Sequence, residues 1–126
     1  MASSSLSRWL AAGGVALMAA IVFATLMPAE WQIRLGLHWL IEHFLAYFAL
    51  TLIFCLAWPR PMAVAALLVP FATLLETAQG LTPDRVPDPA TALFAATGVA
   101  VAALLADLAI TLRRRVRLGA ATGRKA

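Results

Sequence analysis

Residues 38–58 read HWLIEHFLAYFALTLIFCLAW, and this stretch decides the fold class. Its only formally charged side chain is Glu42, which stands beside His43. A helix needs about 20 mostly apolar residues to cross the hydrocarbon core of a bilayer. Backbone groups cannot stay unpaired in lipid, so an apolar stretch of this length is expected to be helical. The stretch therefore predicts a membrane-spanning helix that carries ionisable groups near one end.

Three further stretches of the chain have a similar length and character. They cover approximately residues 8–28, 62–81 and 89–112. The chain has 126 residues, of which 63% are hydrophobic and 13% charged, so no room is left for a second domain. The uncharged run over 9–27 is longer than the apolar core of a signal peptide, so we expect an uncleaved span. The sequence predicts an all-α integral membrane bundle of four transmembrane helices, forming a single domain over 1–126.

The positive charges are distributed unevenly along this predicted topology. Arg34 and Arg85 lie in the loops 29–37 and 82–88, whereas the other Lys and Arg residues lie on the side of the two termini. Lys and Arg are enriched on the cytoplasmic side of membrane proteins, so both termini are predicted to be cytoplasmic. Residues 113–126 then form a basic cytoplasmic tail beside the last span. Such a tail attracts anionic lipid, and we expect membrane lipids rather than nucleic acid as partners. The terminal-side charges are Arg8, Arg60, Arg113, Arg114, Arg115, Arg117, Arg124 and Lys125.

Polar side chains from distant parts of the sequence are predicted to meet near the outer face. His43 lies about 7 Å along its helix from the outer end, and Glu76 lies at a similar depth in the third span. Ionisable residues inside a membrane are costly, so they mark a functional site by default. Tyr47 shares a helix face with His43, and the turn after the third span supplies more polar groups. The ligand-binding candidates are His43, Tyr47, Glu76, Gln79, Arg85 and Asp88.

Each candidate also has an ordinary structural interpretation. His43 and Gln79 could join helices by hydrogen bonds, Tyr47 could be a packing aromatic, and Arg85 could anchor the chain at the interface. No metal site is predicted, because His38 and His43 are five residues apart and fall on different helix faces. No cofactor is expected either. The single cysteine, Cys55, excludes an intrachain disulfide framework.

Small residues recur every three or four positions in two of the predicted spans. Such ridges let helix backbones approach closely, so we expect the first and fourth spans to pack on each other. The same ridges could instead receive another membrane protein. The ridges are Ala12, Ala16, Ala20 and Ala24 in the first span, and Ala95, Gly98, Ala102 and Ala106 in the fourth.

Three motifs resemble the VanZ-like family of small bacterial membrane proteins. Residues 43–48, HFLAYF, match a His-x-x-x-Tyr-Phe segment, and Glu76-x-x-Gln79 followed by Arg85 matches a second block. Gly98 matches the glycine that follows that block. The resemblance covers roughly the whole chain. The chain departs from it at Trp39-Leu40, where the family has Asp-Lys, and at Thr91 and Ala95, where it has Asp and Asn.

The resemblance implies a multi-pass protein of the bacterial cytoplasmic (inner) membrane, in a family linked to teicoplanin resistance. Its expected function is to bind a lipid-linked or amphiphilic ligand, either a glycopeptide-type antibiotic or an envelope lipid, at an outer-leaflet polar site. Two alternatives remain open. Glu76 and His43 could act as an acid–base pair on an envelope lipid, or the chain could be a non-catalytic interaction module. The sequence offers no clear nucleophile or metal site, which disfavours the enzyme.

Overall fold

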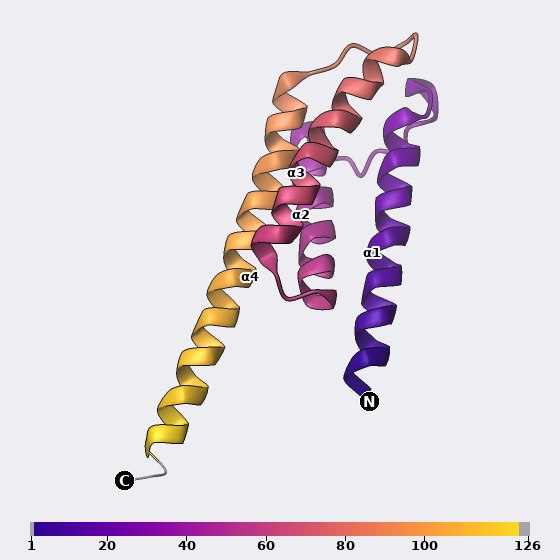
Figure 1. Cartoon of the computed structure of the whole chain (residues 1–126). Coiled ribbons are helices and arrows are strands. Elements are labelled where there is room, and N and C mark those ends of the chain that lie inside the picture. The colour runs from indigo at the N-terminus through magenta and orange to yellow at the C-terminus, as the bar shows by residue number, and fades with distance from the viewer. Residues whose placement is uncertain (1, 124–126) are drawn as a thin grey trace.

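The computed structural model describes residues 2–123, and this part of the chain is helical and contains no strand (Figure 1). Each of the four long helices is long and apolar enough to cross a membrane, so the predicted four-helix membrane fold is confirmed. The short 3₁₀ helices η1 and η2 lie in the connection after α1 and at the end of α3. The elements are α1 (Ala2–Leu26), η1 (Ala29–Trp31), α2 (Trp39–Ala57), α3 (Pro61–Ala78), η2 (Gln79–Leu81) and α4 (Pro89–Gly123).

Proline and aspartate set several of the helix boundaries. α1 ends two residues before Pro28, since a proline disfavours helical geometry in the residue before it. Pro61 and Pro89 are the first residues of α3 and α4, where a missing N–H costs no helical hydrogen bond. Asp88 caps α4, because its Oδ1 accepts a 2.9 Å hydrogen bond from the Ala90 N–H. The helices overlap the four predicted spans, but α1 begins at Ala2 rather than at residue 8, and α4 continues to Gly123 rather than ending at residue 112.

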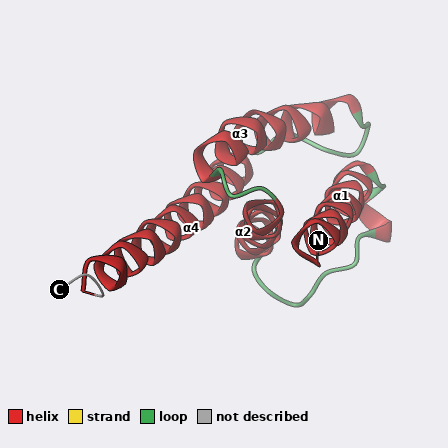
Figure 2. Ribbon diagram, turned by 60° about the horizontal axis from the view of Figure 1, so that its bottom comes forward, coloured by secondary structure: helices red, strands yellow, loops and turns green. Residues whose placement is uncertain are grey.

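Helix α2 is the centre of the bundle. It packs most extensively against α4 and also against α1, while α3 packs mainly on α4 (Figure 2). The core lies at these contacts and includes Leu50 of α2 and Val99 of α4, which are both fully buried. The rest of the core cluster consists of Tyr47, Cys55, Val64, Leu68, Ala72 and Ala95.

The small-residue ridge of α4 is a packing surface, as predicted. Ala95, Gly98 and Ala102 are all buried. A Cβ atom placed on Gly98 would collide with the Phe44 carbonyl oxygen, so the backbones of α4 and α2 touch at this point. A glycine is required there because the obstacle is main chain, which cannot rotate away as a side chain can.

The predicted pairing of the first and fourth spans is wrong. Within residues 2–123, α2 stands between α1 and α4, and these two helices share no interface (Figure 2). The ridge Ala12, Ala16, Ala20 and Ala24 is exposed. α1 instead meets α2 through another face, where a Cβ on Gly14 would lie 3.0 Å from Phe54 Cε1. Small residues permit a close approach without selecting the partner, and α2 fits the α4 ridge.

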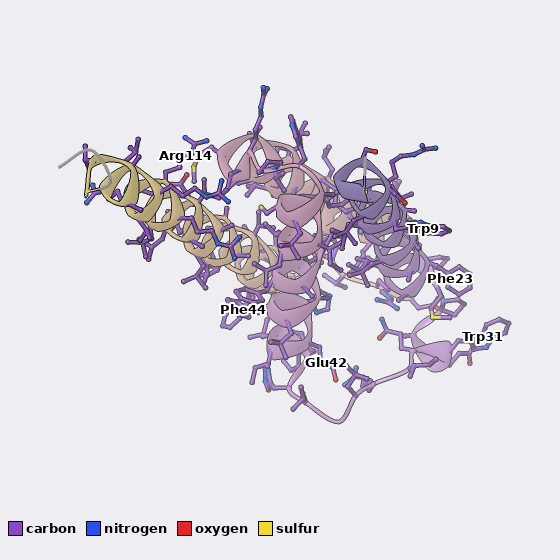
Figure 3. All side chains as sticks on the ribbon, turned by 90° about the horizontal axis from the view of Figure 1, so that it is seen from below. Trp9, Phe23, Trp31, Glu42, Phe44 and Arg114 are labelled. Carbon is purple, nitrogen blue, oxygen red and sulfur yellow. The ribbon has the colours of Figure 1, made fainter. Side chains whose placement is uncertain are left out.

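Most of the helical surface is left to contact lipid. Only 17% to 33% of the most apolar part of each span is buried within the protein. Large apolar side chains such as Trp9, Phe23 and Trp31 point away from the bundle (Figure 3). The 35 residues of α4 extend about 52 Å, which exceeds the roughly 30 Å hydrocarbon core.

The predicted tail therefore begins as a continuation of α4, which projects beyond the other helices (Figure 1). Arg113, Arg114, Arg115 and Arg117 lie on this helical extension, while Arg124 and Lys125 lie outside the described residues. Both ends of the described chain lie at the same end of the bundle. Their assignment to the cytoplasm stays a prediction.

Candidate functional site

A hollow of about 320 Å³, here called the polar recess, lies at the bundle end opposite the termini. This open hollow is lined by residues of α2, α3, the start of α4 and the two loops at that end. Five of the six predicted site residues line it, so the expected convergence at one depth is found in the structure. Its lining includes Trp39 and His43 from α2, Glu76 from α3, Gln79 from η2, and Arg85 and Asp88 from the loop before α4.

A second hollow of about 310 Å³, here called the α1/α2 hollow, adjoins the polar recess. The two share Gln32, Arg34, Trp39 and His43 as walls. Tyr47, the sixth predicted site residue, lines this second hollow. The six candidates therefore line two adjacent hollows that have four wall residues in common.

Glu76 is buried at the junction of α3 and α4, with 7% of its surface exposed. Its Oε1 accepts a 3.0 Å hydrogen bond from the Asp88 N–H, at the amino end of α4. The positive end of the α4 dipole also stabilises a negative charge there. No protein group in the described chain bonds Oε2. The carboxylate thus joins two helices through one oxygen and leaves the other for the recess.

Gln79 is 6% exposed, and its side-chain amide has no hydrogen-bond partner within the described chain. Arg85 Nε is the one unpartnered side-chain atom of these residues that is also fully enclosed. The amide of Gln79 and Oε2 of Glu76 therefore keep contact with the recess. Since Gln79 follows Glu76 by three residues, the two side chains lie on the same face of the chain.

One ring nitrogen of His43, Nδ1, has a hydrogen-bond partner that determines which nitrogen carries the proton. Its Nδ1 lies 2.7 Å from the Trp39 carbonyl oxygen, which can only accept a hydrogen bond. Nδ1 therefore carries the proton, and in the neutral ring Nε2 holds a lone pair. No protein donor in residues 2–123 reaches Nε2. The ring can accept a hydrogen bond or a proton from a molecule in either hollow.

Tyr47 is 3% exposed and packs its ring against Phe71, with the ring centroids 6.3 Å apart. Its hydroxyl has no hydrogen-bond partner in the described part of the protein. The ring is thus a core residue, as the structural interpretation expected. The hydroxyl is available to the α1/α2 hollow.

Arg85 acts mainly as a brace between distant segments. Its Nη2 donates a 2.8 Å hydrogen bond to the Met27 carbonyl oxygen, just beyond the end of α1. With the Gln32 amide oxygen turned toward the guanidinium, that oxygen accepts from Nη1 at 2.8 Å and Nη2 at 2.6 Å. Arg85 therefore holds the loop before α4 against the end of α1. Both terminal nitrogens of the guanidinium are thus committed to protein acceptors, and the unpartnered Nε is fully enclosed.

Asp88 is likewise committed to local structure. Besides the bond from Ala90, its Oδ2 accepts a 3.2 Å hydrogen bond from the Thr91 hydroxyl. Both carboxylate oxygens are used to cap α4. Its contribution to the site is the backbone N–H that positions Glu76.

Three polar residues of the site are not among the six predicted candidates, although Asp84 was expected in the same outer loop. Arg34 lines both hollows, is exposed and has no partner among the described residues. Gln32 bonds Arg85, and Asp84 adds an exposed carboxylate to the recess. Their positions depend on the folded path of the two outer loops. The only sequence signal for Arg34 was its place among the few charges opposite the termini.

Glu42 supports the loop that carries Arg34. Its Oε1 accepts hydrogen bonds from the N–H groups of Leu35, at 2.9 Å, and Leu37, at 3.3 Å. Between them Gly36 has a φ of 82°, a conformation that favours glycine. Glu42 is therefore a loop tether beside the site.

The recess combines three carboxylates with two arginines, yet none of these groups forms an ion pair with another in the described chain. No cluster of three or more His, Cys, Asp or Glu side chains that could hold a metal occurs among residues 2–123. No family model, curated protein or solved structure matches this chain. The chemical argument therefore depends on the geometry of the recess.

Proposed function

We propose that this protein binds an amphiphilic, lipid-linked molecule whose polar group enters the polar recess while its apolar part stays in the bilayer. The observation that carries the proposal is Gln79, which is 6% exposed and has no side-chain partner in the described chain. It lines the same hollow as the unpaired oxygen of Glu76 and Nε2 of His43. These groups keep contact with the recess and have no protein partner among the described residues, so each can form a hydrogen bond with a polar group that enters it.

The surroundings of the recess support an amphiphile over a fully water-soluble ligand. The four helices that form the bundle leave most of their surface to lipid. An apolar groove of about 630 Å³ is lined mostly by residues of α1, together with Trp31 of η1 and Phe71 of α3. Met27 lines this groove, and its carbonyl oxygen accepts the hydrogen bond from Arg85. The hydrogen bond between Arg85 and Met27 thus joins a residue that lines the polar recess to one that lines the apolar groove.

The proposal also covers the membrane in which the protein lies and the family to which it belongs. Most Lys and Arg residues lie on the side of the termini, which favours an outward-facing recess in the bacterial cytoplasmic membrane. If the resemblance to the VanZ-like family holds, the ligand is an envelope lipid or a glycopeptide-type antibiotic, and teicoplanin susceptibility depends on the protein. The motifs around His43 and Glu76 support this assignment, because they supply the free groups of the recess.

Photo-crosslinking tests the proposed site. A benzoylphenylalanine at Trp39, which lines both hollows, should trap one class of amphiphile from native membranes at several times its bulk abundance. Trp58 provides the matched control, since it follows the other end of α2 and is similarly exposed, at 42% against 44% for Trp39. Mass spectrometry of the adducts compares the two positions. Adducts of bulk composition at both positions would contradict the proposal.

A second candidate function is acid–base catalysis on the bound lipid. The fixed tautomer of His43 supports it, because Nε2 presents a lone pair in a recess that also contains the Glu76 carboxylate. The same purified protein, incubated with labelled envelope lipid, should then yield a product that His43→Gln abolishes. Unchanged lipid throughout would remove this candidate.

The third candidate function is an interaction module that binds another membrane protein through a small-residue ridge. Of the two ridges, in α1 and in α4, only one is accessible. Gly98 and its neighbours are buried against α2, so the α4 ridge is not free to receive a partner. The exposed ridge Ala12, Ala16, Ala20 and Ala24 remains. A crosslink at Ala16 to another membrane protein, together with a dispensable Glu76, would favour this candidate over the lipid site.

A further inference from the structure

We propose that the group recognised in the polar recess is a protonated primary amine, carried by the headgroup of an aminophospholipid. This inference rests on the proposed function and specifies its ligand class. The juxtaposition that carries it is a set of hydrogen-bond acceptors without protein donors: Glu76 Oε2, His43 Nε2 and the Gln79 amide oxygen.

The protein itself supplies no cation to these acceptors. Arg85, the arginine deepest in the site, directs its guanidinium at the Met27 carbonyl and at Gln32. Arg34 is exposed and makes no ion pair in the described chain. Glu76 is therefore a buried carboxylate whose sole protein partner is a backbone N–H. A ligand cation would complete its pairing.

A primary ammonium matches this set in both charge and hydrogen bonding. It has three N–H donors and no acceptor, so it can satisfy a carboxylate, an imidazole nitrogen and an amide oxygen together. The low dielectric of a buried site strengthens its attraction to Glu76. A phosphate in the same place would meet three carboxylates, Glu76, Asp84 and Asp88. Glu76 is the buried one of the three, so its carboxylate disfavours an anion in the deepest part of the recess.

The phosphate of such a lipid has its own partner at the rim. Arg34 lines both hollows and has no competing bond in the described residues. Guanidinium groups bind phosphate through two parallel hydrogen bonds. An ammonium near Glu76 with a phosphate near Arg34 describes a phosphoethanolamine headgroup.

A headgroup series tests the inference. Purified protein in phosphatidylglycerol nanodiscs is titrated with short-chain phosphatidylethanolamine, its N-acetyl derivative, phosphatidylcholine and soluble phosphoethanolamine. We expect phosphatidylethanolamine to bind at least roughly tenfold more tightly than the N-acetyl lipid, which lacks the charge. Phosphatidylcholine keeps the charge without N–H donors and should fall between them. If soluble phosphoethanolamine competes with the lipid, the headgroup alone is sufficient for binding. If it does not compete, the lipid chains are also required. Either result upholds amine recognition.

Glu76→Gln provides the protein-side test. Its amide oxygen can still accept from the Asp88 N–H, so the α3–α4 junction is retained while the charge is lost. The variant should lose roughly tenfold or more of its preference for phosphatidylethanolamine over the N-acetyl lipid. Glu30→Gln is the matched control, because Glu30 is an exposed carboxylate in η1 outside the recess, and it should retain the preference. The thermal stabilities of Glu30→Gln and Glu76→Gln in detergent are compared to check that both variants are folded.

The failures of the two proposals are distinguishable. Equal binding of all headgroups, with enrichment of one lipid class still found at Trp39, would overturn amine recognition alone. A preference for the amine that survives in Glu76→Gln would also overturn it. Absence of any lipid binding and of enrichment at Trp39 would overturn the proposed function as well.

Discussion

Replacement of Gly98 by alanine should destabilise the protein by about 1–3 kcal/mol, the usual cost of inserting a methyl group into a packed interface. The added Cβ would collide with the Phe44 carbonyl, so α4 would have to move away from α2. That interface is the most extensive in the bundle and contains the fully buried Leu50 and Val99. The measurement is thermal or denaturant unfolding in detergent micelles.

Gly13→Ala is the matched control for this prediction. Gly13 also lies within a helix, but a Cβ there has no neighbour within 4 Å. Alanine favours helix over glycine by roughly 0.5–1 kcal/mol, so this variant should be unchanged or slightly stabilised. Equal stability of the Gly98 and Gly13 variants would contradict the close contact between α2 and α4.

Arg85→Ala should loosen the end of α1 while leaving its packing against α2 in place. The guanidinium joins the loop before α4 to Met27 and Gln32, although Arg85 and Met27 are 58 residues apart in sequence. Hydrogen bonds to a charged group contribute about 1.5–3 kcal/mol each, so a loss of about 2 kcal/mol is expected. The rate of amide hydrogen exchange at the last turn of α1 should increase in this variant, while the rate in α2 should change little.

Arg85→Lys separates the charge of this side chain from its geometry. Lysine keeps the charge but lacks the planar fork that reaches two acceptors, so it should restore only part of the stability. Full restoration by lysine would show that charge alone matters at this position. Unchanged exchange in α1 after the alanine substitution would contradict the brace.

The fold class followed from the sequence because apolar length is a strong signal in a membrane protein. A long helix overlaps each predicted span, and prolines set several boundaries, although α4 continues to Gly123, beyond the predicted end at residue 112. Which helices pack against each other could not be predicted from the sequence. Ala16 and Gly98 lie in ridges of similar composition, yet one is exposed and the other buried. Which ridge is used depends on the complementary surface of α2, which a one-dimensional pattern does not encode.

The site was partly predictable for a related reason. Helix topology and rise put His43 and Glu76 at one depth, which explains why both line the polar recess. Two of the candidates have local roles, since Asp88 caps α4 and Arg85 braces α1. The position of Arg34 at the site could not be predicted, because it depends on the conformation of a loop that hydrogen bonds to Glu42 stabilise. Loop geometry of this kind has no periodicity to reveal it.

The central claim is that His43 and Glu76 face one shared recess, and paired cysteines test it most directly. In a Cys55→Ala background, cysteines at 43 and 76 should react together with a bifunctional thiol reagent whose spacer is about 10 Å, near one helix diameter. The control pairs position 43 with Leu74, which is 69% exposed and lies on the opposite face of α3. We predict efficient crosslinking of the first pair and little of the second. Equal crosslinking of both pairs, or a preference for the control, would contradict the shared recess.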